Sequence, residues 1–115
     1  MKIIVEGRTH PSLNTWTNWH WAKKSRVKKS WENEIYYLCN KFNQPELKEA
    51  IVDITYYFKS NRRRDRDNYT PKFILDGLVK AGVIVDDSDN NLYLNWKLKV
   101  DKDNPRTEIE VREVS

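Results

Sequence analysis

Residues 50–58 read AIVDITYYF, and this segment gives the clearest indication of the fold. Successive side chains of an extended chain point to opposite sides, so Val52, Ile54, Tyr56 and Phe58 share one face. The segment is rich in β-branched and aromatic residues, which favour strands. It therefore predicts a β-strand, and the periodicity of the flanking sequence indicates what surrounds that strand.

A helical period precedes this strand. From about Trp19 the apolar residues recur every three or four positions, as on one face of an amphipathic helix. Gln44-Pro45 should end the helix, because the residue before a proline avoids helical angles. The residues of this apolar stripe are Val27, Trp31, Ile35, Leu38 and Phe42.

A second helix is predicted after the strand. It should begin at Thr70-Pro71, with the threonine as N-cap and the proline in the first turn, where its missing N–H costs little. Leu75, Leu78 and Val79 form its apolar stripe, and Gly82 is a typical helix stop.

The remaining segments complete an α/β pattern. Alternating apolar residues predict strands around residues 3–5, 92–100 and 107–111, whereas residues 8–18 have the composition of a loop. The order strand, helix, strand, helix, strand, strand predicts one small α/β domain over residues 1–115. Its core would be a mixed β-sheet of about four strands packed with two α-helices.

Composition excludes several classes of protein. The 115 residues include 33% charged and 38% hydrophobic side chains, with a net charge of +4. No apolar run approaches the roughly 18 residues that a membrane-spanning helix needs, and Glu6 interrupts the N-terminus too early for a secretory signal. Because Cys39 is the single cysteine, we expect no disulfide within the chain and no zinc site. The expected location is therefore cytoplasmic.

Acidic residues follow two of the predicted extended segments. Asp65 and Asp67 are two positions apart after the strand at residues 50–58, and the pair Asp86-Asp87 follows a short extended run. We expect both acidic segments, together with Lys72, near the same end of the sheet. Carboxylate oxygens supplied by separate loops are ligands that Mg²⁺ takes in proteins. The sequence therefore predicts a metal site.

Each of these features also has a purely structural interpretation. Asp-x-Asp in a polar segment is usually turn chemistry. Residues 86–91 could be an acidic loop or a calcium loop, although the glycine and the distal glutamate of a calcium loop are absent. Lys72 and Asp76 lie four apart on the predicted helix and could form an exposed ion pair. Whether Asp86 or Asp87 is the metal ligand stays open.

Basic residues accompany the acidic ones. Arginines beside carboxylates compete with a free cation, but they suit a site at which a phosphate backbone arrives together with the metal. The lysines of the first predicted helix form a second basic cluster. The candidates for contacts with DNA are Arg62, Arg63, Arg64, Arg66, Lys23, Lys24 and Lys28.

Together these motifs resemble those of the RusA family of Holliday junction resolvases. One departure is that Tyr69-Thr70-Pro71 puts three residues before Lys72, where the family pattern has two. Pro11-Ser12-Leu13-Asn14 resembles the Pro-Ser-x-Asn loop of that family. The closest resemblance lies in Arg62-Arg63-Arg64-Asp65-Arg66-Asp67-Asn68, in Lys72 and Asp76, and in Lys80-Ala81-Gly82 followed by Asp86-Asp87.

The resemblance implies a Mg²⁺-dependent endonuclease, with Mn²⁺ as an alternative ion, that acts as a homodimer. Such an enzyme cuts four-way DNA junctions by paired symmetric nicks in DNA recombination and repair, and is typically encoded by a phage or prophage. By motif position, Asp65, Asp67 and Asp87 would bind the metal, Lys72 would be the essential lysine, and Asp76 a supporting acid. The number of metal ions stays open.

Two other functions remain open. The same fold and metal could serve a nuclease for forks, flaps or other branched DNA. Alternatively, the basic loop and the tryptophans could belong to a non-catalytic nucleic-acid-binding module. His10 and His20 belong to no recognisable catalytic arrangement. Tyr56, Tyr57 and Phe58 are candidates for a dimer surface.

Overall fold

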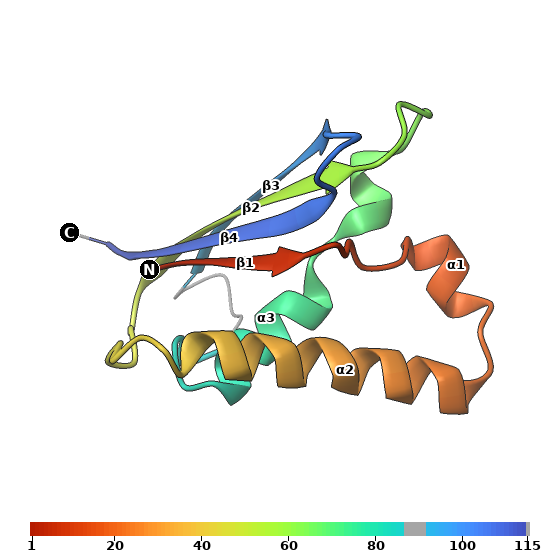
Figure 1. The fold of residues 1–115 in the computed structure, drawn as a ribbon. Coiled ribbons are helices and arrows are strands. Elements are labelled where there is room, and N and C mark those ends of the chain that lie inside the picture. The colour runs from red at the N-terminus through yellow and green to blue at the C-terminus, as the bar shows by residue number, and fades with distance from the viewer. Residues whose placement is uncertain (87–91, 115) are drawn as a thin grey trace.

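The computed structural model describes residues 1–86 and 92–114. Helices and strands alternate along most of the chain, and two consecutive strands end it (Figure 1). In chain order the elements are β1 (Lys2–Glu6), α1 (Leu13–Thr17), α2 (Trp21–Cys39), β2 (Ala50–Phe58), the short 3₁₀ helix η1 (Arg66–Tyr69), α3 (Lys72–Lys80), β3 (Leu92–Val100) and β4 (Arg106–Glu113).

The four strands form one mixed sheet in the order β1-β4-β2-β3. β2 pairs in parallel with β3 and antiparallel with β4, and β1 pairs antiparallel with β4. Ala50 lies opposite Leu92 and Phe58 opposite Val100, so β2 and β3 begin and end together. The α/β class and the mixed sheet predicted from the sequence are confirmed.

The core lies between the sheet and the helices, because α2 and α3 lie on the same face of the sheet (Figure 1). Val52, Ile54, Tyr56 and Phe58, which the sequence places on one face of the strand, are all buried. Trp31 and Ile35 of α2, Leu78 of α3 and Cys39 at the end of α2 are also buried, and four of the five residues of the predicted stripe lie in α2. Burying a large apolar side chain contributes about 1.5–3 kcal/mol, so this layer holds the fold together.

Two local predictions in the first half of the chain are wrong. Residues 8–18 contain a short helix, α1, which begins because the Ser12 side chain accepts a hydrogen bond from the Thr15 N–H at 3.2 Å. Serine favours turns and helix N-caps for the same reason, so composition alone did not distinguish them. The long helix ends at Cys39, and Phe42 lies beyond it with 41% of its surface exposed.

The second half shows similar differences. Pro71, without a side-chain hydrogen bond, caps α3, whereas Thr70 ends η1 and its hydroxyl donates to the Asp67 carbonyl at 3.1 Å. Gly82 has a φ of +73°, which confirms it as the residue that stops the helix. Residues 83–85 form no strand, only a single bridge between Ile84 and Leu47.

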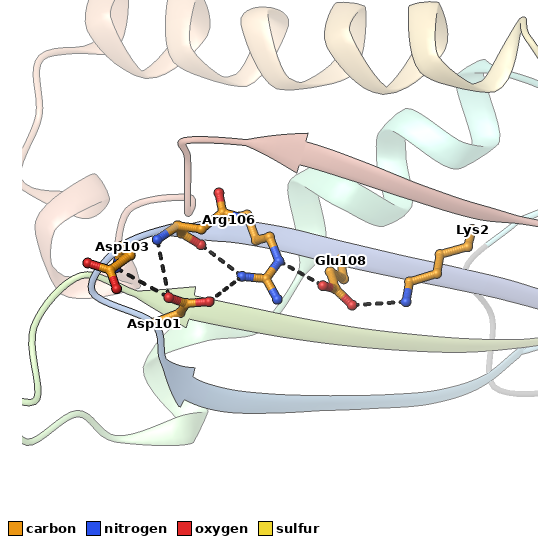
Figure 2. A network of polar contacts seen from close by, with 6 residues as sticks. Lys2, Asp101, Asp103, Arg106 and Glu108 are labelled. Carbon is orange, nitrogen blue, oxygen red and sulfur yellow. Dashed lines mark hydrogen bonds and ion pairs between the residues drawn. The ribbon is translucent and has the colours of Figure 1, made fainter.

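The other face of the sheet carries a chain of ion pairs (Figure 2). Lys2 lies 3.1 Å from Glu108, Arg106 lies 2.7 Å from Glu108, and Arg106 lies 2.8 Å from Asp101. The Arg106 guanidinium also stacks 3.8 Å from the centroid of the Tyr57 ring. These side-chain contacts link β1, β4 and the turn between β3 and β4, in addition to the backbone pairing of β1 with β4.

The candidate dimer residues on β2 are mostly unavailable. Tyr56 is 0% exposed and Phe58 is 6% exposed, because both point into the core. Tyr57 is half-buried beneath Arg106 on the opposite face. A second copy of the chain would therefore have to bind another surface.

Candidate active site

Asp65 and Asp67 lie in an ordered turn that follows β2. The chain extends beyond the end of β2 and returns to form η1 (green in Figure 1). Asp65 caps η1: one of its carboxylate oxygens accepts from the Asp67 N–H at 3.1 Å, and its carbonyl accepts from the Asn68 N–H at 3.0 Å. Both side chains are exposed. The turn therefore presents two carboxylates to the solvent in a defined local conformation.

Lys72 and Asp76 lie on α3, but they do not pair with each other. Lys72 is the first residue of the helix and is exposed. Asp76 lies 3.5 Å from Lys28 of α2, and Lys28 also lies 4.0 Å from Glu32. Asp76 thus links the two helices, and Lys72 forms no ion pair with any residue that the structure describes.

The second acidic segment lies only partly within the described residues. Asp87 lies outside the described residues, and Asp86 is exposed. The expectation that both acidic segments lie at the same end of the sheet is wrong for Asp86, the part of the second segment that the structure describes. β2 and β3 are parallel, so Asp65 follows the end of β2 whereas Asp86 precedes the beginning of β3. However, η1 turns back along β3, and Arg66 contacts Trp96 near the middle of that strand.

The donors present suit a hard cation, although the set is incomplete. The oxygens of Asp65 and Asp67 are the kind of ligand that Mg²⁺ and Mn²⁺ take from proteins. Within residues 1–86 and 92–114, no group of three or more histidine, cysteine, aspartate or glutamate side chains is arranged to hold a metal. The third predicted ligand, Asp87, falls in the segment between these ranges.

The segment of residues 8–18, which includes α1, is hydrogen-bonded to the turn that carries the aspartates. The Asn14 N–H donates to the Asn68 side chain at 3.1 Å. His10 is 3% exposed, and its Nε2 contacts the Tyr56 hydroxyl, which lies 3.0 Å from the Tyr69 carbonyl. Burial lowers the pKa of His10 and raises the pKa of Tyr56. The sequence indicated no role for His10, although the Pro-Ser-x-Asn motif that follows it pointed to this loop.

A polar cleft of about 310 Å³ lies between residues 9–15 and the arginine-rich loop, residues 59–66. Hydroxyl groups of Ser12, Thr15 and Ser60 line it, together with the cations of Lys59 and Arg62. No aspartate or glutamate is among the lining residues. A cleft with this lining favours an anion such as a phosphate group.

The arginines of this loop differ in what they contact. Arg64 stacks 3.9 Å from the centroid of the Phe58 ring and donates to the Ser60 carbonyl at 2.8 Å. Arg62 and Arg63 are exposed, and in the described part of the chain their side chains form no hydrogen bond or ion pair. These two arginines are therefore available to a ligand, whereas Arg64 is largely committed to its own loop.

A second group of cations lies at the N-terminal end of α2. Lys23 lies 4.1 Å above the Trp19 ring and Lys24 lies 5.0 Å above the Trp16 ring. Trp21 is 74% exposed. Lys28 and Lys72 line the same small cavity, of about 60 Å³. Lys23 and Lys24 thus lie beside aromatic rings, and Lys28 lies on the same cavity as the candidate catalytic lysine.

Comparison with known protein families identifies the class. Residues 5–112 match the family described as Endodeoxyribonuclease RusA, so the chain belongs to the RusA family. It is therefore an endodeoxyribonuclease, a hydrolase that acts on DNA, and the family implies an enzyme that resolves Holliday junctions. Nucleases of this family generally depend on a divalent metal. The chain matches no curated protein. Among the described residues, none of the helices has the length and apolar character needed to cross a membrane.

Proposed function

We propose that this chain cuts four-way DNA junctions by Mg²⁺-dependent hydrolysis, as a homodimer that makes paired symmetric nicks. The observation that carries the proposal is the exposed pair Asp65 and Asp67, held on an ordered turn. Arg64 and Tyr69, close to this pair in the chain, line the cleft that Lys59 and Arg62 also line. The membership of the RusA family supports DNA as the substrate. A four-way junction has twofold character, so a twofold dimer could bring one site to each of two opposed strands.

In this proposal Asp65, Asp67 and Asp87 hold the metal, with Asp86 as the alternative to Asp87. When bound, the ion would activate water and neutralise charge on the phosphate oxygens. Lys72, exposed at the start of α3, would place its ammonium group against the charge that develops on the phosphate. Asp76 would act indirectly, because its ion pair with Lys28 holds α2 and a second ammonium group beside α3.

The proposed contacts with the DNA backbone come from two surfaces. Arg62 and Arg63 project from the loop after β2, and Lys23, Lys24 and Lys28 from α2. Contacts of this kind give affinity without reading the base sequence, and they make binding depend steeply on salt. They suit an enzyme that recognises the shape of its substrate.

The test is incubation of the purified protein with a synthetic four-way junction, with and without Mg²⁺, beside Asp67→Asn. We expect Mg²⁺-dependent nicks in two opposed strands by the wild type. We expect no nicks by Asp67→Asn, which should still bind the junction because only a metal ligand has changed. Full nicking by Asp67→Asn would refute the assignment of that ligand.

Two controls separate the alternative functions. Equal cleavage of a fixed junction and of matched forks or flaps would indicate a general nuclease for branched DNA. Binding without any Mg²⁺-dependent or Mn²⁺-dependent nicking, unaffected by Asp67→Asn, would indicate a non-catalytic binding module. Gel filtration with light scattering would test the homodimer, since a monomer bound to the junction contradicts paired cleavage by two subunits.

A further inference from the structure

Arg66 lies between the two candidate metal ligands, but its side chain is directed to β3. Its Nε donates to the Trp96 carbonyl at 2.9 Å, and its Nη2 lies 3.4 Å from the Asn95 side-chain oxygen. The guanidinium carbon lies 3.9 Å from the centroid of the Trp96 ring. Three contacts thus join one arginine to two consecutive residues of the neighbouring strand.

The contact between Arg66 and Trp96 is reciprocal. The indole Nε1–H of Trp96 donates to the Arg66 carbonyl at 3.0 Å. The side chain of each residue therefore bonds the main chain of the other. Such a pair fixes both the position and the orientation of η1 relative to β3, which a single hydrogen bond does not do.

The Arg66 side chain is bonded to β3 rather than to the two carboxylates next to it in the chain. Among the residues that the structure describes, Arg66 forms no ion pair with Asp65 or Asp67, because its donors are directed to the strand. The capping bond from Asp67 N–H to Asp65 stabilises the turn internally but does not attach it to the sheet. Three contacts attach it to other elements: Arg66 with Trp96, Asn14 with Asn68, and the Tyr56 hydroxyl, which donates to the Tyr69 carbonyl at 3.0 Å.

We propose that Arg66 and Trp96 are positioning residues that hold the segment Asp65–Tyr69 in place for metal binding, and that Arg66 does not contact DNA. The inference rests on the proposed role of Asp65 and Asp67. It divides the arginine-rich loop by function: Arg62 and Arg63 contact the DNA backbone, whereas Arg66 belongs to the framework of the site. Small displacements of a catalytic group lower the reaction rate. We therefore expect the contact between Arg66 and Trp96 to affect the activity.

The first experiment measures amide hydrogen exchange of residues 65–70 and needs no nuclease activity. Arg66→Lys keeps the charge but loses the planar, stacked group that bonds the carbonyl. Trp96→Phe keeps an aromatic ring but removes the indole donor. We expect exchange about tenfold faster in both variants, as for the loss of a hydrogen bond to a charged group. Arg63→Ala, the matched control, should leave exchange unchanged.

The second experiment measures junction binding in EDTA at several salt concentrations. A residue that neutralises one phosphate contributes about 0.9 to the slope of log K against log salt. Arg63→Ala should lower the slope by about this amount, whereas Arg66→Ala should not. With activity restored by metal, Arg66→Ala should need a higher Mn²⁺ concentration for half-maximal nicking while nicking at saturating Mn²⁺ is largely retained.

The two experiments decide the inference. Unchanged exchange in both Arg66→Lys and Trp96→Phe would overturn it, and so would a flattened salt slope in Arg66→Ala. A wild-type protein that nicks no junction would refute the proposed function but would leave the exchange result to decide whether the pair positions the turn. A lower melting temperature with unchanged metal dependence would reduce the pair to a general stabilising contact and would also overturn the inference.

Discussion

At the scale of single residues, Tyr56 joins residues 8–18 to η1, two segments that are far apart in the sequence. Its hydroxyl lies between the His10 ring and the Tyr69 carbonyl. His10 Nδ1 lies 2.9 Å from the Pro11 carbonyl, which only accepts, so Nδ1 carries a proton. Burial lowers the pKa of His10, which favours the neutral ring. Nε2 is then an acceptor, and the single Tyr56 proton serves both Nε2 and the carbonyl.

We predict that Tyr56→Phe lowers the free energy of unfolding by about 1–3 kcal/mol, because it leaves buried acceptors without a donor. The measurement is urea denaturation followed by tryptophan fluorescence. Tyr57→Phe is the matched control, because the Tyr57 hydroxyl forms no hydrogen bond within the described residues. An equal loss in both variants would contradict the role of the buried hydroxyl.

At the scale of elements, the crossing of α2 and α3 depends on a residue without a side chain. A methyl group at Gly77 would lie 3.1 Å from Cβ and Cδ1 of Ile35, which is fully buried. Ile35 has little room to move in a close-packed core. Gly77 therefore lets α3 approach α2, and the close approach brings Asp76 within reach of Lys28.

We predict that Gly77→Ala destabilises the protein by on the order of 1 kcal/mol, as overpacking outweighs the gain in helix propensity. Adding Ile35→Val should help to identify the cause. Ile35→Val alone should cost about 0.5–1.5 kcal/mol, but less in the Gly77→Ala background, because valine lacks the Cδ1 atom that the new methyl group would meet. Additive losses in urea denaturation would argue against a steric conflict between the new methyl group and Cδ1 of Ile35.

The success of the sequence predictions differed by the type of element. β2 and β3 were predicted with the observed bounds, because alternation of apolar residues over nine positions is a strong signal. α1 and η1 were missed, since short helices are set by capping groups such as Ser12 and Asp65 rather than by a periodic stripe. Local sequence does not distinguish such caps from ordinary turns.

For the candidate site, the sequence indicated which residues could take part in the chemistry, but not which contacts hold them in position. Asp65 and Asp67 were predicted from their spacing, and the structure shows them exposed on one turn. The contacts of Arg66 with Trp96 and of Asn14 with Asn68 join segments that only the fold brings together. The sequence pattern of one segment alone does not predict which distant residue it will contact. The assignment of the ligands themselves stays a prediction.

At the scale of the whole molecule, the ion pairs on the face of the sheet opposite the helices make the stability depend on pH. The hydrogen bond from Arg106 lowers the pKa of Asp101. For Glu108, burial alone would raise the pKa, but hydrogen bonds from Arg106 and Lys2 lower it. Carboxyl groups with lowered pKa values contribute stability above their ordinary pKa, and this stability is lost as the pH falls through the lowered value.

We predict that Glu108→Gln lowers the melting temperature at pH 7 and weakens its fall between pH 5 and pH 3. The effect should be modest, because the network is partly exposed and screened by salt. His10, whose lowered pKa adds a loss of stability below pH 6.5, is common to both proteins and cancels in the difference. Glu113→Gln on the same strand is the control, because Glu113 forms no ion pair with the described residues. If the melting temperatures of the wild type and of Glu108→Gln fell in parallel as the pH was lowered, the prediction would be contradicted.

The contact between Arg66 and Trp96 also bears on how copies of the chain can associate. β3 is an outer strand with a neighbour on one side only, and such edges readily recruit foreign strands and cause aggregation. Arg66 occupies the Trp96 carbonyl in the middle of this edge strand, and Lys97 and Lys99 place charges beside it. The contact of Arg66 with Trp96, which holds η1 against β3, thus also disfavours fibril-like association through β3. We therefore expect Arg66→Ala to aggregate at lower protein concentrations than the wild type does.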